Sequence, residues 1–474
     1  MAERTLVKNT TYFTAALTFQ KILSFIYFWF ISNNLFAESL GQYVFALSFT
    51  TLFSIFIDLG LSPILTREAS KDNAGANRLL RNVIGLKLPL AAATLLAAWL
   101  FINVTGKPPE VKLLVYLASF VMVLDSFSLS FWVMFRARHT LTYESIATVL
   151  VQMIIFTLGI IALKTSGQIR HLMLALLVAS LFNFGLSALL LKRKLHFSLK
   201  PEWSAEVIDG LLRVVPAFAL AGVFVKIYNT VDSILLSYLV GDAAVGLFAI
   251  PAKVVYAFQQ VIPAAFAAVI FPAFSTYYKR SPNLLHETFL KAFRYLTIIS
   301  LPLAAGLVTL VGPIIGTLWP RYAAVIPTFI VMSLAIPFIF LAFPTGYLMN
   351  ACDRQRQTTT NRGIITALAV ILNLSLIPSL SFYGAGIAFL ITNVVLLGLD
   401  FIWVRKLIPL KLAALGSFVG KSALATAVMV LLLLGIRHQV HVFVAAPIGA
   451  LAYFAVLVGI RGFRFSELTV TKER

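Results

Sequence analysis

Long apolar runs recur along almost the whole of this chain, and they limit the folds open to it. A helix that crosses a bilayer needs about 20 mostly apolar residues. Roughly fourteen runs approach that length, at residues 10–33, 41–65, 83–103, 112–135, 145–163, 171–191, 213–240, 244–271, 293–318, 324–350, 363–378, 384–404, 413–435 and 441–460. The chain is 60% hydrophobic and 12% charged, whereas soluble domains are about 45–50% apolar and 25% charged. We therefore expect an all-α polytopic membrane protein with about fourteen transmembrane helices.

The basic residues lie in short clusters between these runs. If both termini are cytoplasmic, 29 of the 38 lysines and arginines, Lys87 among them, fall in inner segments, and six, including Lys107, fall in outer ones. This asymmetry follows the positive-inside rule. A net charge of +20 is therefore explained by membrane topology, and a nucleic-acid partner is not expected. The outer loops are too short to form a domain.

Two positions suggest an internal duplication. At an offset of 205 residues, Lys21 aligns with Lys226 and Gly41 with Gly246. An offset of six spans keeps the orientation, so the halves would be parallel repeats related by a pseudo-twofold axis along the membrane normal. We expect an N-lobe of six helices at 1–197, a cytoplasmic linker at 198–212, a C-lobe of six helices at 213–404, and two C-terminal helices with a cytoplasmic tail at 405–474.

Three lysines lie inside predicted spans: Lys21, Lys226 and Lys253. A lysine at the bilayer centre costs about 2.5–3.5 kcal/mol on insertion scales, so each needs a reason. Asn229 and Asp232 follow Lys226 at intervals of three, which places successive members on one helix face. We predict a water-filled cavity between the lobes in which the lysines and Asn229 bind an anion. The alternative is that buried Lys–Asp pairs only hold helices together.

Four acidic residues also lie within spans. Asp58 is expected in the inner half of the membrane, close enough to pair with a basic group there. Asp232 suits cation coupling and ion pairing equally. Asp125 is a weaker candidate for the same roles, and a structural role is favoured for it and for Asp400. Coupling to H⁺ or to Na⁺ stays open.

Motifs for enzyme chemistry are not found in the sequence. It contains no Walker lysine motif, dinucleotide-binding glycine pattern or zinc-binding pair, so no cofactor or metal is expected. The single cysteine, Cys352, reads as a small apolar core residue.

Several stretches resemble the polysaccharide-transporter branch, which includes the O-antigen flippases, of the multidrug, oligosaccharidyl-lipid and polysaccharide exporter superfamily. They are FISNNLFAESLGQYVFALSF at 30–49, DLGLSPILTREASKD at 58–72, VDSILLSYLVGDAAVGLFAIPAKV at 231–254, FPAFSTYYK ending at Lys279, and the region 318–395. These occur in the family's order over about four-fifths of the chain.

The resemblance implies two six-helix lobes around a central cavity. It also implies flipping of an undecaprenyl-diphosphate-linked oligosaccharide across the bacterial inner membrane, by alternating access, for surface polysaccharide assembly. A polysaccharide polymerase and a chain-length regulator are the protein partners it suggests. Lysines can hold a diphosphate as point charges, although the mid-span cations here are all lysine where some relatives have arginine.

Other functions remain to be weighed. A lipid II flippase is close to the first reading, and a cation-coupled multidrug antiporter of the same superfamily would favour an acidic cavity. A membrane glycosyl-polymerase needs a large outer loop, and a scaffold leaves the buried lysines unexplained.

Overall fold

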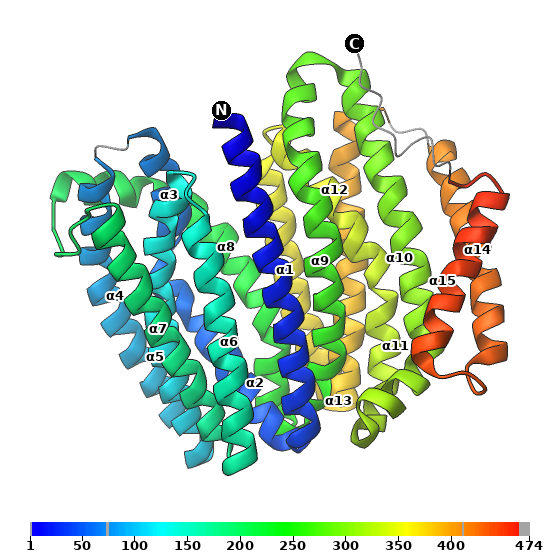
Figure 1. Ribbon diagram of the computed structural model, residues 1–474, viewed down its shortest axis with the longest axis horizontal. Helices are drawn as coiled ribbons and strands as arrows, with labels where there is room; N and C mark the ends of the chain where they lie inside the picture. Colours follow the sequence, from blue (N-terminus) through cyan, green and yellow to red (C-terminus); the bar gives the residue numbers. More distant parts are fainter. Residues whose placement is uncertain (1, 73–74, 410–411, 464–474) are drawn as a thin grey trace. The chain divides into compact units, whose positions relative to one another are not determined.

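The computed structural model describes residues 2–72, 75–409 and 412–463, and that part of the chain is helical apart from short connections (Figure 1). Side chains are described for these residues except 2–11, 212, 214, 216–218, 264, 265, 268 and 412–415. The chain forms two compact units, Met1–Ala249 and Ile250–Arg474.

The first unit holds eight helices and the start of a ninth. They are α1 (Ala2–Asn34), α2 (Ala37–Asp58), α3 (Leu61–Lys71), α4 (Ala76–Val104), α5 (Pro109–Ala137), α6 (Thr142–Thr165), α7 (Ile169–Lys194), α8 (Ala205–Leu239) and the first turns of α9 (Asp242–Arg280). Helix α5 packs against α2, α4 and α7, α6 packs against α1 and α7, and α8 packs against α2, α3 and α4.

The second unit contains the rest of α9 and six further helices with a 3₁₀ turn. These are α10 (Pro282–Leu318), η1 (Pro320–Val325), α11 (Ile326–Leu334), α12 (Ile336–Ala351), α13 (Gln355–Leu407), α14 (Leu412–Ile436) and α15 (Val442–Gly459). Helix α10 packs against α11, α12, α14 and α15, and α13 packs against α11 and α12. Cys352 is 1% exposed in an apolar cluster of this unit.

The predicted membrane fold is confirmed. Thirteen described segments are long and apolar enough to cross a bilayer. One of them, α13, has 53 residues, and at about 1.5 Å per residue a straight helix of that length is far longer than the 30 Å hydrocarbon core. It breaks at Ser381 (φ 54°, ψ −140°), and a Cβ on Gly384 would lie 2.5 Å from the carbonyl oxygen of Leu376. The chain therefore turns back, and α13 supplies both predicted spans, 363–378 and 384–404.

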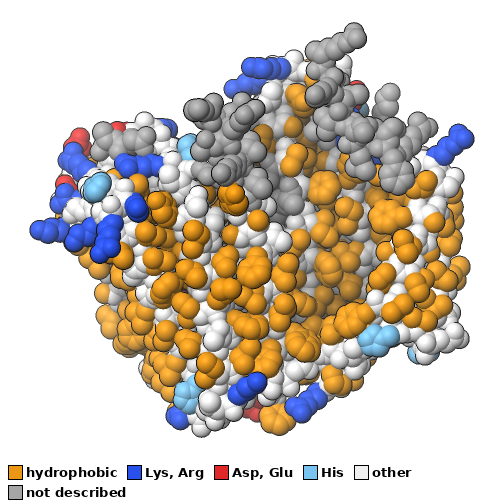
Figure 2. Space-filling view, viewed as in Figure 1, with side chains coloured by type: hydrophobic (Ala, Val, Ile, Leu, Met, Phe, Trp, Pro, Cys, Tyr) orange, Lys and Arg blue, Asp and Glu red, His pale blue; other side chains and the backbone are white. Residues whose placement is uncertain are grey.

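Large apolar side chains cover much of the surface. Leu100, Leu431 and Leu451 are 68%, 70% and 72% exposed, and Figure 2 shows hydrophobic side chains along the helices with lysines and arginines gathered near helix ends. Lipid can solvate such a surface, whereas water cannot without a large free-energy cost.

The predicted linker is mostly extended and docks on α4. Residues 196–204 are not helical, and α8 begins at Ala205. The Ser204 amide donates to Asn82 Oδ1 at 2.6 Å, and a Cβ on Gly85 would lie 2.4 Å from the Glu202 carbonyl oxygen. The compact units divide after Ala249 rather than at this linker, so the boundary between the two lobes stays a prediction.

Two glycines allow α2 and the first turn of α9 to cross, within the first unit. A Cβ on Gly41 would lie 1.7 Å from the Asp242 carbonyl oxygen, and one on Gly246 would lie 1.9 Å from the Ala37 carbonyl oxygen. Ala37 and Asp242 are also separated by the 205 residues of the proposed repeat. The contact is thus reciprocal, as in a two-fold interface, which supports the duplication.

Candidate functional site

The second predicted span, 41–65, is interrupted next to an acidic residue. Helix α2 ends at Asp58, Leu59 and Gly60 follow in the left-handed region (φ 41° and 76°), and α3 begins at Leu61. The hydroxyl of Ser62, in the first turn of α3, donates to Asp58 Oδ1 at 2.5 Å. Asp58 therefore lies where the positive end of the α3 dipole favours a carboxylate.

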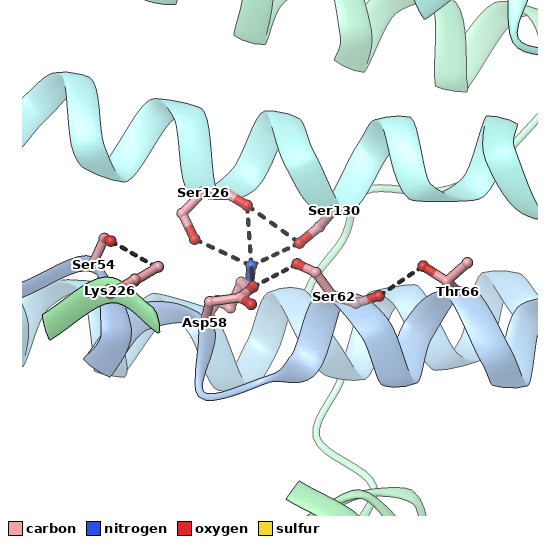
Figure 3. A network of polar contacts seen from close by, with 8 residues as sticks. Ser54, Asp58, Ser62, Thr66, Ser126, Ser130 and Lys226 are labelled. Atoms are coloured by element: carbon pink, nitrogen blue, oxygen red, sulfur yellow. Dashed lines mark hydrogen bonds and ion pairs between the residues drawn. The ribbon is translucent and has the colours of Figure 1, made fainter. Parts of the chain in front are cut away.

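A buried lysine from α4 satisfies Asp58. Lys87 is completely buried, and its Nζ lies 2.8 Å from Asp58 Oδ1. The same ammonium donates to Ser130 Oγ at 2.8 Å, and it lies 3.0 Å from the Ser126 carbonyl oxygen and 3.1 Å from Ser126 Oγ. Figure 3 shows Ser126 and Ser130 on one helix, facing Asp58 and Ser62. A buried ion pair needs such additional hydrogen bonds to offset desolvation.

Asp58, Ser62 and Ser126 border a cavity of about 570 Å³ within the first unit. Hydroxyl groups are frequent in its wall, and the remaining lining is apolar or charged. The lining residues are Leu47, Thr50, Thr51, Ser54, Asp58, Ser62, Pro63, Thr66, Ala118, Val121, Met122, Asp125, Ser126, Leu129, Val133, Arg136, Leu176 and Lys226. A cavity of this size and mixed character falls in the range of small-ligand sites.

Lys226 is the cation of this cavity wall that has no carboxylate partner among the described residues. Its Nζ donates to Ser54 Oγ at 2.8 Å (Figure 3), and an ammonium has three donors. Arg136, the other lining cation, is engaged by the buried Glu144: its Nε donates to Glu144 Oε2 at 2.8 Å, and its Nη2 makes a second bond to the same carboxylate. Lys226 is therefore the group in this wall best able to bind an anion.

Charge in the cavity is almost balanced. Asp58 pairs with Lys87 and Arg136 pairs with Glu144. Asp125 also lines the cavity and accepts a hydrogen bond from Ser180. Among the described residues no ion pair involves Asp125 or Lys226, so these two carry the uncompensated charges of the wall.

The structure brings only part of the predicted site together. Lys226, Asp58 and Asp125 share the cavity. Lys21 on α1 and Asn229 on α8 are exposed outside its lining, and Asp232 is buried in α8.

Two candidates belong to the second unit. Lys253 is half-buried in α9. Asp400 is 1% exposed and accepts a hydrogen bond at 2.8 Å from Asn361 Nδ2 and one at 3.3 Å from Thr345 Oγ1. These contacts match the structural role that the sequence favours for Asp400.

Two lysines assigned to loops in the sequence-based topology form ion pairs, and one of them, Lys87, is buried inside a helix. Lys87 is an interior residue of α4 and not an inner-loop cation; its place inside the apolar run 83–103 was the available signal. Lys107 donates to Asp242 Oδ1 at 2.9 Å and to Ser237 Oγ at 2.6 Å, and it lies over the rings of Phe45 and Tyr238 at 4.8 and 5.1 Å. It ties the α4–α5 connection to the start of α9.

Comparisons with known proteins place the chain in a family. The family model described as "Polysaccharide biosynthesis protein" matches residues 6–278, which is more than half of the chain. The chain belongs to this family. A search of curated proteins finds no match.

Solved structures share the fold. The structure titled "Lipid II flippase MurJ, inward closed conformation" has a TM-score of 0.79 at 15% identity, over 95% of this chain and 98% of that one. An inward-facing multidrug resistance MATE transporter of the MOP superfamily has a TM-score of 0.66 at 17% identity, over 82% and 94%. An outward-facing MATE transporter of the same superfamily has a TM-score of 0.58 at 17% identity, over 85% of this chain and 94% of that one. They confirm the expected superfamily fold.

Proposed function

We propose that this protein is a flippase that carries an undecaprenyl-diphosphate-linked oligosaccharide across the bacterial inner membrane for surface polysaccharide assembly. The observation that supports this most directly is Lys226, a cation that has no carboxylate partner among the described residues and lies in a hydroxyl-rich cavity of a membrane-embedded helical unit. The family's role in polysaccharide biosynthesis supports the saccharide part of the substrate.

The chemistry of the cavity suits such a substrate. A diphosphate cannot cross hydrocarbon without its charge being compensated, and a lysine ammonium supplies a compact positive charge that adapts to different phosphate orientations. Hydroxyls such as Thr50, Thr51 and Ser54 can exchange hydrogen bonds with phosphate or sugar oxygens. The polyprenyl chain would stay in the surrounding lipid.

Coupling to H⁺ or Na⁺ is part of this proposal, and Asp125 is the group we assign to it. Its carboxylate is the uncompensated negative charge of the wall. Neutralising it by a proton or a cation leaves Lys226 with an excess positive charge, which favours the anionic substrate.

The structurally similar proteins suggest two alternative classes of substrate. A lipid II flippase would carry a related polyprenyl diphosphate, and a multidrug antiporter would carry unrelated compounds. We favour the oligosaccharide because the matching family is one of polysaccharide biosynthesis. A polysaccharide polymerase and a chain-length regulator would be its partners.

Complementation tests the proposal. Lys226→Ala should abolish surface polysaccharide in a flippase-deficient strain that the native protein restores, while the variant still inserts at normal levels. Lys164→Ala is the matched control, because Lys164 is exposed at the end of α6 and outside the cavity. Full complementation by Lys226→Ala would refute the anion-binding role. Rescue of lipid II flippase depletion, without restored surface polysaccharide, would favour lipid II instead.

A further inference from the structure

Asp58 lies close enough to Lys226 to compete with a bound anion for its ammonium group. Ser54, which accepts from Lys226, precedes Asp58 by four residues on α2, so both side chains lie on one helix face about 5–6 Å apart at Cβ. Asp58 acts electrostatically on Lys226. Lysine has a flexible four-carbon side chain, so a change of rotamer would bring the Lys226 ammonium toward that carboxylate.

Lys87 makes such a movement of Lys226 unnecessary, because it already neutralises Asp58. Its ammonium is completely buried and its three donors are shared among Asp58, Ser126 and Ser130. It cannot turn toward a ligand in the cavity without abandoning these partners. It does neutralise Asp58, which lines the cavity, whereas Lys87 lies outside the lining.

We propose that Lys87 is a positioning residue for anion binding: by occupying Asp58 it keeps the ammonium of Lys226 available for the substrate's phosphate groups. Without Lys87, Asp58 would be a half-buried carboxylate without its ion pair, and Lys226 is the other cation that acts on it. A carboxylate that loses its ion pair in such a site is strongly unfavourable. Asp58 would therefore form an ion pair with Lys226, and the Lys226 ammonium would no longer be available to an anion. The inference rests on the proposed function, because it presumes that Lys226 binds the diphosphate.

The pairing predicts a specific pattern of loss and rescue. Lys87→Met should lose anion binding, because Asp58 then takes Lys226. Lys87→Met combined with Asp58→Asn should regain it, because the competing carboxylate is gone. Lys226→Met should lose binding in every background.

The experiment uses the full-length purified protein in detergent and farnesyl diphosphate as the probe, with farnesol as the uncharged control. Binding is followed as a ligand-dependent rise in unfolding temperature, and the apparent Kd is taken from the titration. We expect Lys87→Met to raise the apparent Kd for farnesyl diphosphate by at least about tenfold, a loss of affinity typical of a disrupted charge contact. The double variant should return to within about threefold of the native Kd, and farnesol should not distinguish the variants.

A merely structural role for Lys87 gives a different result. It would lower the unfolding temperature of Lys87→Met without ligand and leave the Kd of the folded protein unchanged, which would overturn the proposal. If Lys87→Met does not fold, the double variant decides: native-like binding supports the proposal, and lost binding in a folded double variant refutes it. If Lys226→Met binds normally, the proposed function itself fails.

Discussion

Alanine at Gly41 should destabilise the protein, although alanine inside a helix normally stabilises it relative to glycine. A Cβ at this position would lie 1.7 Å from a backbone oxygen of α9, whereas ordinary contacts begin at 3.4 Å. The obstacle is backbone, so no side-chain rotation relieves it, and the helices must separate by about 1.7 Å. Overpacking of this kind costs about 1–3 kcal/mol, and we expect the upper end because α2 also packs on α4, α5 and α8.

The assay is thermal unfolding in detergent, with Gly185→Ala as the control. Gly185 lies inside α7 with open space around it, so alanine there should stabilise by about 0.5–1 kcal/mol. At roughly 2 °C or more per kcal/mol, Gly41→Ala should lower the Tm by about 7–8 °C or more relative to the control.

The reciprocal contact adds a second test. Gly246→Ala should cost a similar amount, because its Cβ would meet the Ala37 carbonyl oxygen at 1.9 Å. The double variant should cost less than the sum of the two, since the first substitution already separates the helices. Equal Tm values for Gly41→Ala and Gly185→Ala would show that the crossing is looser than described here.

Three further predictions concern other parts of the chain. Asp125→Asn should leave substrate flux in vesicles but remove its dependence on the ion gradient; unchanged dependence would place coupling elsewhere. Burial raises the pKa of the Cys352 thiol to about 11, so at pH 7–8 it stays protonated and N-ethylmaleimide should modify only denatured protein; rapid labelling of native protein would contradict its burial. Gly85→Ala should undock the linker, because its Cβ would lie 2.4 Å from the Glu202 carbonyl oxygen, and endoproteinase Glu-C should then cleave after Glu202 faster in inside-out vesicles; unchanged resistance would count against this docking.

Hydropathy alone predicted where the helices lie. The boundary between the predicted spans 363–378 and 384–404 coincides with the break at Ser381. The break after Asp58 could not be predicted in the same way, since it places Leu59, a non-glycine residue, at φ 41°. Such a conformation is stabilised by tertiary contacts rather than by local preference.

The candidate site was only partly predictable. A lysine inside an apolar run can be recognised, and Lys226 was found that way. Which cation neutralises which carboxylate depends on helices that are distant in sequence, as with Lys87 and Asp58, which are 29 residues apart. The duplication register, by contrast, pairs Gly41 with Gly246, the two glycines at which α2 and α9 cross.

The Lys87–Asp58 pair has a consequence for how this chain can change over generations. Losing either partner alone leaves a buried charge, at a cost of about 3–5 kcal/mol, a large share of the stability of an ordinary domain. Losing both together leaves no charge behind. A lineage can therefore cross between the charged and uncharged states only by near-simultaneous substitution, and homologous chains should carry the two residues together or lack them together.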